Sequence, residues 1–359
     1  MAAVAIVPGR VAAASCSGPI RSSDDSWQTR GILSMTTRSA LAPAATPLIW
    51  SALGPRDQIS VTGADACNFI ENFTTNKVSD LNVGEGCASF FCDARGWVLE
   101  LALIRRIENG LLIDVATGHA AALLAHLDRY HIREQLELRD VSGLEAGVVF
   151  LGAASVDWLR EQFDQPLPER PQNFISGHLQ ACVGLTQPLS ARLTCFDWYG
   201  ADGFLLEGAV AEVALLTAGL AATAAPLSVE EQTARRLRRG WPLASDIPAK
   251  TLPQEVGFTE QTICFTKGCY LGQETVARLD ALGHVNRRLT VLTVEGEAPV
   301  AAGAVVASAG KAIASVTSAA RLESPPGWLA MAIVPLQATK QSDSLTVDGR
   351  PARPAFTHE

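Results

Sequence analysis

Residues 266–278 read TKGCYLGQETVAR and bring a lysine, a cysteine and a glutamate close together, with two glycines among them. The apolar run TICF before this stretch, residues 262–265, predicts a short strand. QETVARLDAL predicts a helix that begins near Gln273 and ends near Gly283. The stretch is therefore a predicted strand-to-helix turn. Such a turn presents free N–H groups at a helix N-terminus, where negative charge is favoured.

Cys269 stands at this turn, and Lys267 lies two positions before it. A nearby cation and a helix N-terminus both lower the pKa of a thiol, so we expect Cys269 to be more acidic than a free cysteine. The alternative is a packed turn cysteine, and the residues alone leave both interpretations open. Gln273 could bind a ligand amide or the backbone, whereas Glu274 could simply begin the helix.

Composition excludes several classes of protein. The chain has 359 residues, and a prior of about 150 residues per domain predicts two or three domains. Hydrophobic residues make up 48%, enough for buried cores, but no apolar run approaches the ~18–20 residues of a membrane span. The net charge is −8, and an acidic chain lacks the basic surface that holds a nucleic-acid backbone. We therefore expect neither a direct nucleic-acid partner nor a membrane partner.

Eight cysteines are present without any Cys-x-x-Cys, so the simplest zinc and redox signatures are missing. We expect free thiols in a reducing compartment, buried as small hydrophobic residues except at Cys269. His119, His126 and His131 are spaced by seven and five positions, which does not place two ligands one helical turn apart. No metal site is predicted; solvated or capping histidines explain this spacing.

Changes in composition and hydrophobic pattern along the chain indicate four segments. Residues 1–46 are rich in Ala, Ser and Pro and lack a period, which predicts a disordered or targeting extension outside the folded core. Residues 47–145 alternate strand-like and helical runs as a first α+β unit, and residues 146–285 form a second one that contains the cysteine stretch. Residues 286–359 consist of short strands with Gly, Pro and Asp between them, which predicts a small C-terminal β-barrel.

A weak internal echo relates the two α+β units. GLLIDVATGHAAALLAHL begins at Gly110, and GFLLEGAVAEVALLTAGL begins at Gly203. Both segments predict a glycine-led strand that runs into an Ala- and Leu-rich helix. The echo suggests related units, although a strand followed by a helix is common enough to match by chance.

Four quoted segments also carry a family resemblance. KGCYLGQE (267–274) resembles the signature of the YgfZ-type folate-binding proteins of iron–sulfur cluster assembly or repair, which are relatives of the glycine-cleavage T-protein, an aminomethyltransferase. The segments 73–100, 235–258 and ASVTSAA (314–320) resemble further blocks of the family, so the similarity spans about residues 47–356. It implies a T-protein-like α+β fold, with two related α+β units around a central cavity and a C-terminal β-barrel.

The resemblance also implies a site. Tetrahydrofolate is the implied cofactor, and Cys269 would supply thiol chemistry with Lys267 as its electrostatic support. The groups implied in cofactor binding are Asn76, Glu100, Asp202, Arg236, Gln273 and Glu274.

Departures from the T-protein pattern weaken the case for that enzyme's activity. Gly96–Leu101 replaces a Gly-Gly-x-x-Asp-Asp stretch and keeps one carboxylate, Glu100. Gly200-Ala201-Asp202-Gly203 lacks the glutamate of Gly-Glu-x-Gly, and Arg236–Gly240 has an arginine where Arg-x-Glu-x-Gly has an acid. A pterin pairs its amino-pyrimidine edge with a carboxylate, because unpaired buried donors are costly. Ordinary aminomethyl transfer is therefore in doubt, while folate binding stays plausible.

Three functions follow as hypotheses. The first is a tetrahydrofolate-binding accessory factor for assembly or repair of iron–sulfur clusters, with iron–sulfur enzymes as client proteins. The second is a folate-dependent aminomethyltransferase in which Glu100 is the working carboxylate, and the third is a non-catalytic interaction protein on the same fold. We favour the accessory factor over an active enzyme. We expect a cytoplasmic protein, or a mitochondrial-matrix protein if residues 1–46 are a transit peptide.

Overall fold

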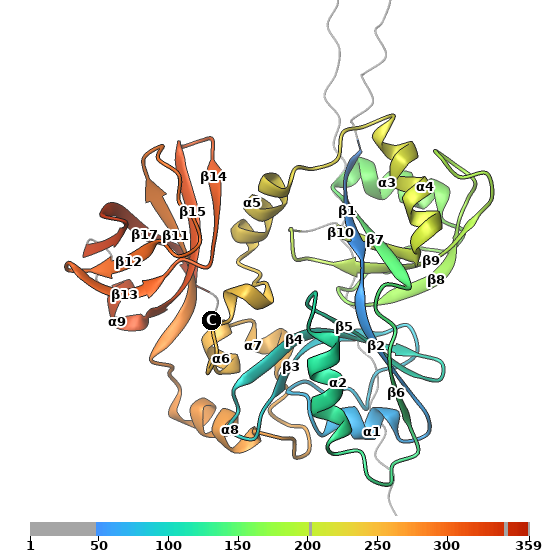
Figure 1. Ribbon diagram of the computed structural model, residues 1–359, viewed down its shortest axis with the longest axis horizontal. Helices are drawn as coiled ribbons and strands as arrows, with labels where there is room; N and C mark the ends of the chain where they lie inside the picture. Colours follow the sequence, from blue (N-terminus) through green and yellow to red (C-terminus); the bar gives the residue numbers. More distant parts are fainter. Residues whose placement is uncertain (1–47, 201–202, 341–343, 358–359) are drawn as a thin grey trace, which may run out of the picture. The chain divides into compact units, whose positions relative to one another are not determined.

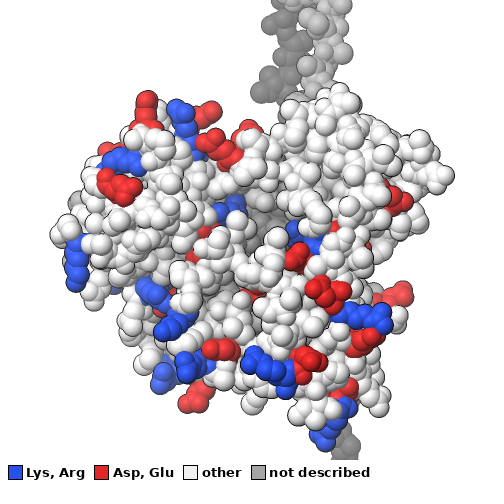
Figure 2. Space-filling view, in the orientation of Figure 1, with Lys and Arg blue, Asp and Glu red and all other residues white. Residues whose placement is uncertain are grey.

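The computed structural model describes residues 48–200, 203–340 and 344–357 (Figure 1). The expected extension 1–46 and the candidate residue Asp202 lie outside the described residues. None of the described helices is long and apolar enough to cross a membrane. Lys and Arg side chains are interspersed with Asp and Glu on the face shown in Figure 2. This mixed pattern differs from the basic surface that binds a nucleic-acid backbone.

The first sheet is antiparallel and carries two helices on one face. Alternate residues of its strands, such as Ile59, Ala102 and Ile113, form a core with helical residues such as Ile70 and Leu127. In sheet order, its strands are β3 (Gly86–Cys92), β4 (Val98–Ile107), β5 (Gly110–Val115), β2 (Asp57–Thr62) and β6 (Glu137–Asp140), and its helices are α1 (Ala66–Glu71) and α2 (Ala120–Asp128).

The second sheet is also antiparallel and packs against two helices (Figure 1). Its core joins strand residues such as Val148 and Leu206 to helical residues such as Leu159 and Leu216. In sheet order, its strands are β1 (Ile49–Pro55), β7 (Glu145–Leu151), β10 (Gly203–Ala209), β9 (Leu189–Phe196) and β8 (Phe174–Leu179), and its helices are α3 (Ala153–Gln162) and α4 (Val210–Ala221).

The two sheets have the same strand order. The first reads β6-β2-β5-β4-β3 and the second β1-β7-β10-β9-β8, so the echoed segments occupy equivalent places as β5–α2 and β10–α4. One expectation needs correction. The boundary after residue 145 assigns residues 49–55 to the first unit, but β1 pairs with β7 in the second sheet. The first strand of the chain completes the second sheet, which no local pattern reveals.

The segment between the second sheet and the C-terminal sheet is mainly helical. Ser228 begins α5 (Val229–Arg239) with a capping box to Glu231, and Gly240 ends it in the left-handed conformation. α5 packs against β14 and β15 of the C-terminal sheet. The short elements that follow are the 3₁₀ helix η1 (Ala244–Asp246), α6 (Pro253–Val256), α7 (Thr259–Thr262) and α8 (Gln273–Leu282).

The strand expected at residues 262–265 is wrong. α7 ends at Thr262, and no strand follows before α8 in this described stretch. The amide of Cys264 bonds to the carbonyl oxygen of Thr75 (2.9 Å), in a turn and not in a sheet ladder. Cys264 is also only partly buried, so the apolar run was too short to separate a strand from a docked loop.

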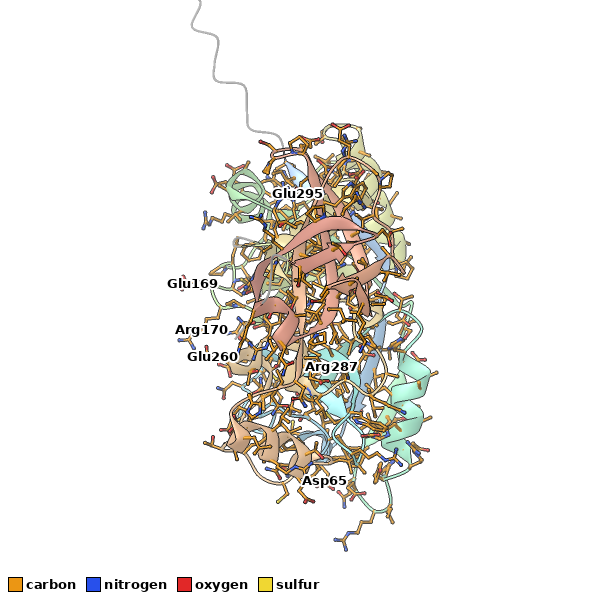
Figure 3. All side chains as sticks on the ribbon, turned by 90° about the vertical axis from the view of Figure 1, so that its left-hand side faces the viewer. Asp65, Glu169, Arg170, Glu260, Arg287 and Glu295 are labelled. Atoms are coloured by element: carbon orange, nitrogen blue, oxygen red, sulfur yellow. The ribbon has the colours of Figure 1, made fainter. Side chains whose placement is uncertain are left out.

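The C-terminal segment forms one curled sheet, a half-barrel that agrees with the expected all-β unit (Figure 1). At its start, Arg287 makes an ion pair with Glu255 of α6 (2.8 Å); Figure 3 labels this arginine. In sheet order, the strands are β13 (Lys311–Ser315), β12 (Val305–Ser308), β16 (Leu345–Val347), β17 (Arg350–Thr357), β11 (Arg287–Glu295), β15 (Gly327–Pro335) and β14 (Ser318–Leu322), and α9 (Leu336–Lys340) follows β15.

A buried network of charges joins the two five-stranded sheets. Arg105 of β4 is fully buried and pairs with Asp114 of β5 and with Glu207 of β10 (2.8 Å to Glu207). Gln58 of β2 donates to both carboxylates, at 2.7 and 3.0 Å. Arg192 of β9 also lies 3.4 Å from Glu207. Each sheet thus contributes an arginine and a carboxylate from equivalent strands. Each of these charges lies beside an opposite charge from its own sheet or from the other sheet.

Replacement of Arg105 by methionine should lower the free energy of unfolding by about 3–5 kcal/mol, because Asp114 and Glu207 lose the fully buried cation that both contact. Arg139→Met is the matched control, since the Arg139 ion pair with Glu137 is exposed and contributes little. Urea denaturation of the three proteins measures the difference. Equal losses in the two variants would show that the network does not hold the sheets together.

Candidate functional site

A cavity of about 540 Å³ lies among β1, β4, β5 and the segments that follow β9 and α5. Its size is typical of a site for a small molecule. One wall is aromatic: Trp198 and Trp241 stack with ring centroids 5.7 Å apart, and Tyr199 lies beside them. The indole N–H of Trp198 is buried and has no hydrogen-bond partner among the described residues. This wall offers a flat surface to a planar ligand.

Glu100 and His119 form a hydrogen-bonded pair at the cavity. Glu100 lies on β4, its side chain is almost fully buried, and its Oε2 is 2.6 Å from His119 Nδ1. The amide of Ala116 donates to its other oxygen at 3.2 Å. Burial raises the pKa of Glu100, and the hydrogen bond from His119 opposes this shift. A carboxyl group with a raised pKa in a cavity is a common feature of functional sites.

A cation also faces the cavity. Arg56 lies between β1 and β2, and its Nε is 3.6 Å from Glu207 while its Nη2 is 3.9 Å from Asp114. These distances exceed hydrogen-bond length, and the Nε–H has no hydrogen-bond partner in the part of the chain that is described. The Arg56 guanidinium therefore lies at the cavity lining with its charge only loosely paired.

Arg236, an expected cofactor-binding residue, does line the cavity but is already engaged. Its Nη1 donates to Asp246 (2.8 Å) and to the carbonyl oxygen of Trp241 (2.7 Å), and its Nη2 donates to Ser318 (2.9 Å). Only 3% of the residue is exposed. These contacts tie α5 to β14 and hold Trp241 at the cavity wall.

The lysine of KGCYLGQE does not point at solvent. Lys267 Nζ donates to the carbonyl oxygens of Glu71 (2.8 Å), Thr74 (2.7 Å) and Asn76 (2.8 Å), and lies 3.2 Å from Glu71 Oε1. Burial lowers the pKa of this ammonium group, and the Glu71 carboxylate opposes that shift. A lysine has three N–H donors, and three carbonyl oxygens use all of them. Lys267 therefore anchors its loop to the turn at residues 71–76.

Gly272 of the same loop packs against Gly96 in the turn between β3 and β4. Gly272 has φ of +83°, and a Cβ there would lie 2.5 Å from the carbonyl oxygen of Asp93 and 2.8 Å from the Cα of Gly96. Any side chain at Gly272 would force these backbones apart. The second glycine of the motif is thus required by close backbone contact.

The remaining expected site residues lie away from the cavity lining. Cys269 is exposed, Gln273 and Glu274 begin α8, and none of the three lines the cavity. The Cys269 sulfur therefore does not open into this cavity. The side-chain amide of Asn76 donates to the carbonyl oxygens of Ala88 (3.0 Å) and Gln261 (2.8 Å). Asn76 therefore holds the backbone of Ala88, a residue of the cavity lining, in place. Electrostatic support of Cys269 by Lys267 stays a prediction.

The chain is similar in sequence to proteins of a known family. Residues 54–262 match the family model of the GCVT N-terminal domain. The chain belongs to this family. It is 24% identical over 301 residues to a putative chloroplastic transferase of Arabidopsis thaliana. This alignment covers 81% of this chain and 66% of the relative. The expected resemblance to YgfZ-type proteins of the family is confirmed.

Two further relatives carry informative names. The tRNA-modifying protein YgfZ of Colwellia psychrerythraea is 24% identical over 67% of this chain and 70% of its own length. The mitochondrial iron-sulfur cluster assembly factor IBA57 homolog of Aspergillus oryzae is 26% identical over 75% of this chain. The alignment spans just under two thirds of the plant relative and 63% of the fungal one.

A solved structure shows the fold. The glycine cleavage system aminomethyltransferase T from Bartonella henselae superimposes with a TM-score of 0.72 at 19% identity, over 87% of this chain and 85% of that protein. The T-protein-like fold expected from the resemblance is confirmed. At this identity the match concerns the fold alone.

Sequence reasoning missed several cavity residues. His119 was interpreted as a solvated or capping residue, and it does occupy the N-cap position of α2, but it also lines the cavity with Glu100. Trp198 and Trp241 were not singled out, although tryptophans near glycines in two separated loops were a usable signal. Arg56, which follows a strand-like run, carried no signal of its own.

Lys267→Met should lower the free energy of unfolding by about 3–5 kcal/mol, because the carbonyl oxygens of Glu71, Thr74 and Asn76 lose their common donor and the Glu71 carboxylate loses its cation. The control is Lys77→Met, whose lysine is exposed and pairs only with Asp80 at the surface; its free energy of unfolding should stay close to wild type. Chemical denaturation compares them. Wild-type stability in Lys267→Met would refute the anchoring role.

Glu100→Gln should gain stability relative to wild type as pH rises. The folded-state pKa of Glu100 lies above its ordinary value of 4.5. Between these two pKa values the native state binds more protons than the unfolded state, so the stability of wild type falls as pH rises. The contribution of Glu100 is complete below that ordinary value and is lost as pH rises through the folded-state pKa, whereas glutamine has no such dependence. Denaturant unfolding from pH 4 to pH 8 measures the difference. A difference that is constant or shrinks with rising pH would contradict the raised pKa.

Proposed function

We propose that this protein binds tetrahydrofolate and acts as an accessory factor in the assembly or repair of iron–sulfur clusters in other enzymes. The observation that carries the proposal is the aromatic-walled cavity with a buried carboxylate and an arginine at its edge. A reduced pterin is a flat ring system with several N–H groups. Glu100 offers an acceptor for such groups, and the Trp198 and Trp241 rings offer a stacking surface.

The arrangement of sheets supports this assignment. We infer that the two α+β units enclose the cavity as equivalent halves, because the first contributes β4 and β5 while the second contributes Leu53 of β1 and the segment after β9. Arg56 and Asp114 belong both to the cavity lining and to the charge network that joins the sheets. The ligand site is then built at the junction that the network stabilises.

The thiol belongs to a different surface. Cys269 is exposed and held on a loop that Lys267 anchors, which suits a reaction with a separate macromolecule better than a reaction inside the cavity. Iron–sulfur enzymes are the proposed client proteins, and the cluster is their cargo. Relatives named as mitochondrial and chloroplastic proteins make an organelle a reasonable alternative to the cytoplasm.

A second candidate is a folate-dependent aminomethyltransferase. The specific observation in its favour is Glu100, a buried carboxylate of the cavity with a raised pKa. Relatives named aminomethyltransferase, such as that of a Nostoc strain at 28% identity over 67% of this chain, point the same way. Assay of aminomethyl transfer by the purified protein separates this function from the accessory role. A non-catalytic interaction protein is the third candidate, and it predicts no folate binding.

Tetrahydrofolate should bind the purified protein in a calorimeter, and Trp241→Ala should weaken binding by about tenfold or more through loss of a stacking surface. Cys269→Ala is the matched control, because Cys269 does not line the cavity and its replacement should leave the affinity unchanged. Absence of binding to wild type would overturn the proposal. Equal affinity of Trp241→Ala and wild type would show that the ligand binds elsewhere.

A further inference from the structure

The pair formed by Glu100 and His119 has a definite hydrogen-bonding sense. Glu100 is a buried carboxylate whose second oxygen already accepts the Ala116 amide. A carboxylate accepts hydrogen bonds, so His119 Nδ1, at 2.6 Å, is the protonated ring nitrogen. The neutral imidazole then has its lone pair on Nε2. The His119 side chain is 44% exposed and lines the cavity, and Nε2 has no protein partner among the described residues.

The loop that holds His119 is fixed at several points. The amide of Gly118 donates to Asp57 of β2 (2.6 Å), and the amide of Ala116 donates to Glu100 of β4. The amide of His119 itself donates to the carbonyl oxygen of Ala116 (2.9 Å). Carboxylates from two strands thus pin this loop, so the imidazole is oriented before any ligand arrives.

Other charged groups near the cavity are engaged or differ from His119 in their chemistry. Asp114 is paired with Arg105 and Gln58, and Arg236 is paired with Asp246. Asp57 accepts from Gly118, while the Arg56 guanidinium carries N–H donors and no acceptor. Burial raises the pKa of Tyr199 above its ordinary range. His119 differs from these groups because its Nε2 lone pair has no protein partner among the described residues.

We propose that His119 exchanges a proton with a weakly basic ring nitrogen of the cavity ligand, with Glu100 as its positioning residue. When the ligand binds, a proton from a buffer acid adds to the lone pair of His119 Nε2, and the conjugate base of the buffer keeps the electron pair of the broken bond. The new N–H of the imidazolium then exchanges its proton with the lone pair of the ligand nitrogen, while the Glu100 carboxylate compensates the positive charge of the imidazolium. The step needs no oxidant or reductant. It rests on the proposed function, because a reduced pterin supplies the ring nitrogen.

Calorimetry with tetrahydrofolate in buffers of different ionisation enthalpy tests the proposal. Wild type should exchange protons with the buffer on binding, so the observed binding enthalpy should change with the ionisation enthalpy of the buffer. His119→Gln should still bind but lose this exchange. His131→Gln is the matched control, since His131 lies beyond the end of α2, does not line the cavity, and should leave the exchange unchanged.

The outcomes separate this inference from the proposed function. No binding to wild type overturns the proposed function, whereas binding without proton exchange, or unchanged exchange in His119→Gln, overturns the role of His119 alone. Nitrogen-15 NMR of the ligand-free protein gives an independent readout. His119 should carry its proton on Nδ1 in wild type and should lose this preference in Glu100→Gln. A proton found on Nε2 in wild type would overturn the inference without any ligand.

Discussion

The buried ammonium group of Lys267 connects two parts of the chain that lie far apart in sequence. Its carbonyl partners in Glu71, Thr74 and Asn76 are 196, 193 and 191 positions away. Neighbouring backbone bonds follow the same course, from Cys264 to Thr75 and from Leu271 to Asn72. These carbonyl oxygens and the Glu71 carboxylate form a cage around the ammonium group. Because a buried cation requires full compensation, the cage fixes the position of the loop that carries Cys269 and of α8, the helix that follows it.

The cage has consequences for function, because it places the thiol and the cavity on different parts of the fold. Cys269 stays at the surface, while the cavity is built from strands of both five-stranded sheets. The charge network of Arg105, Asp114 and Glu207 brings those sheets together and reaches the cavity through Asp114. One fold thus places the cavity and the exposed sulfur on separate parts of its surface.

Local patterns predicted much of the fold and less of the site. Periodicity identified β5–α2 and β10–α4, and short punctuated strands identified the C-terminal sheet. The run at residues 262–265 was mistaken for a strand because its backbone bonds go to a distant turn. β1 was assigned to the wrong sheet for a similar reason. Glu100 came from the family resemblance, but its meeting with His119 depends on strand pairing that no local pattern encodes.

Hydrogen exchange of residues 261–272 tests the central role of Lys267 most directly, because the amides of Cys264 and Leu271 depend on the docked loop. Mass spectrometry of peptides from wild type and Lys267→Met, under native conditions, gives the comparison. The cage predicts exchange at least about tenfold faster in this segment of the variant, beyond any increase shared with peptides of β5 and β10. Wild-type protection of residues 261–272 in Lys267→Met would contradict the account.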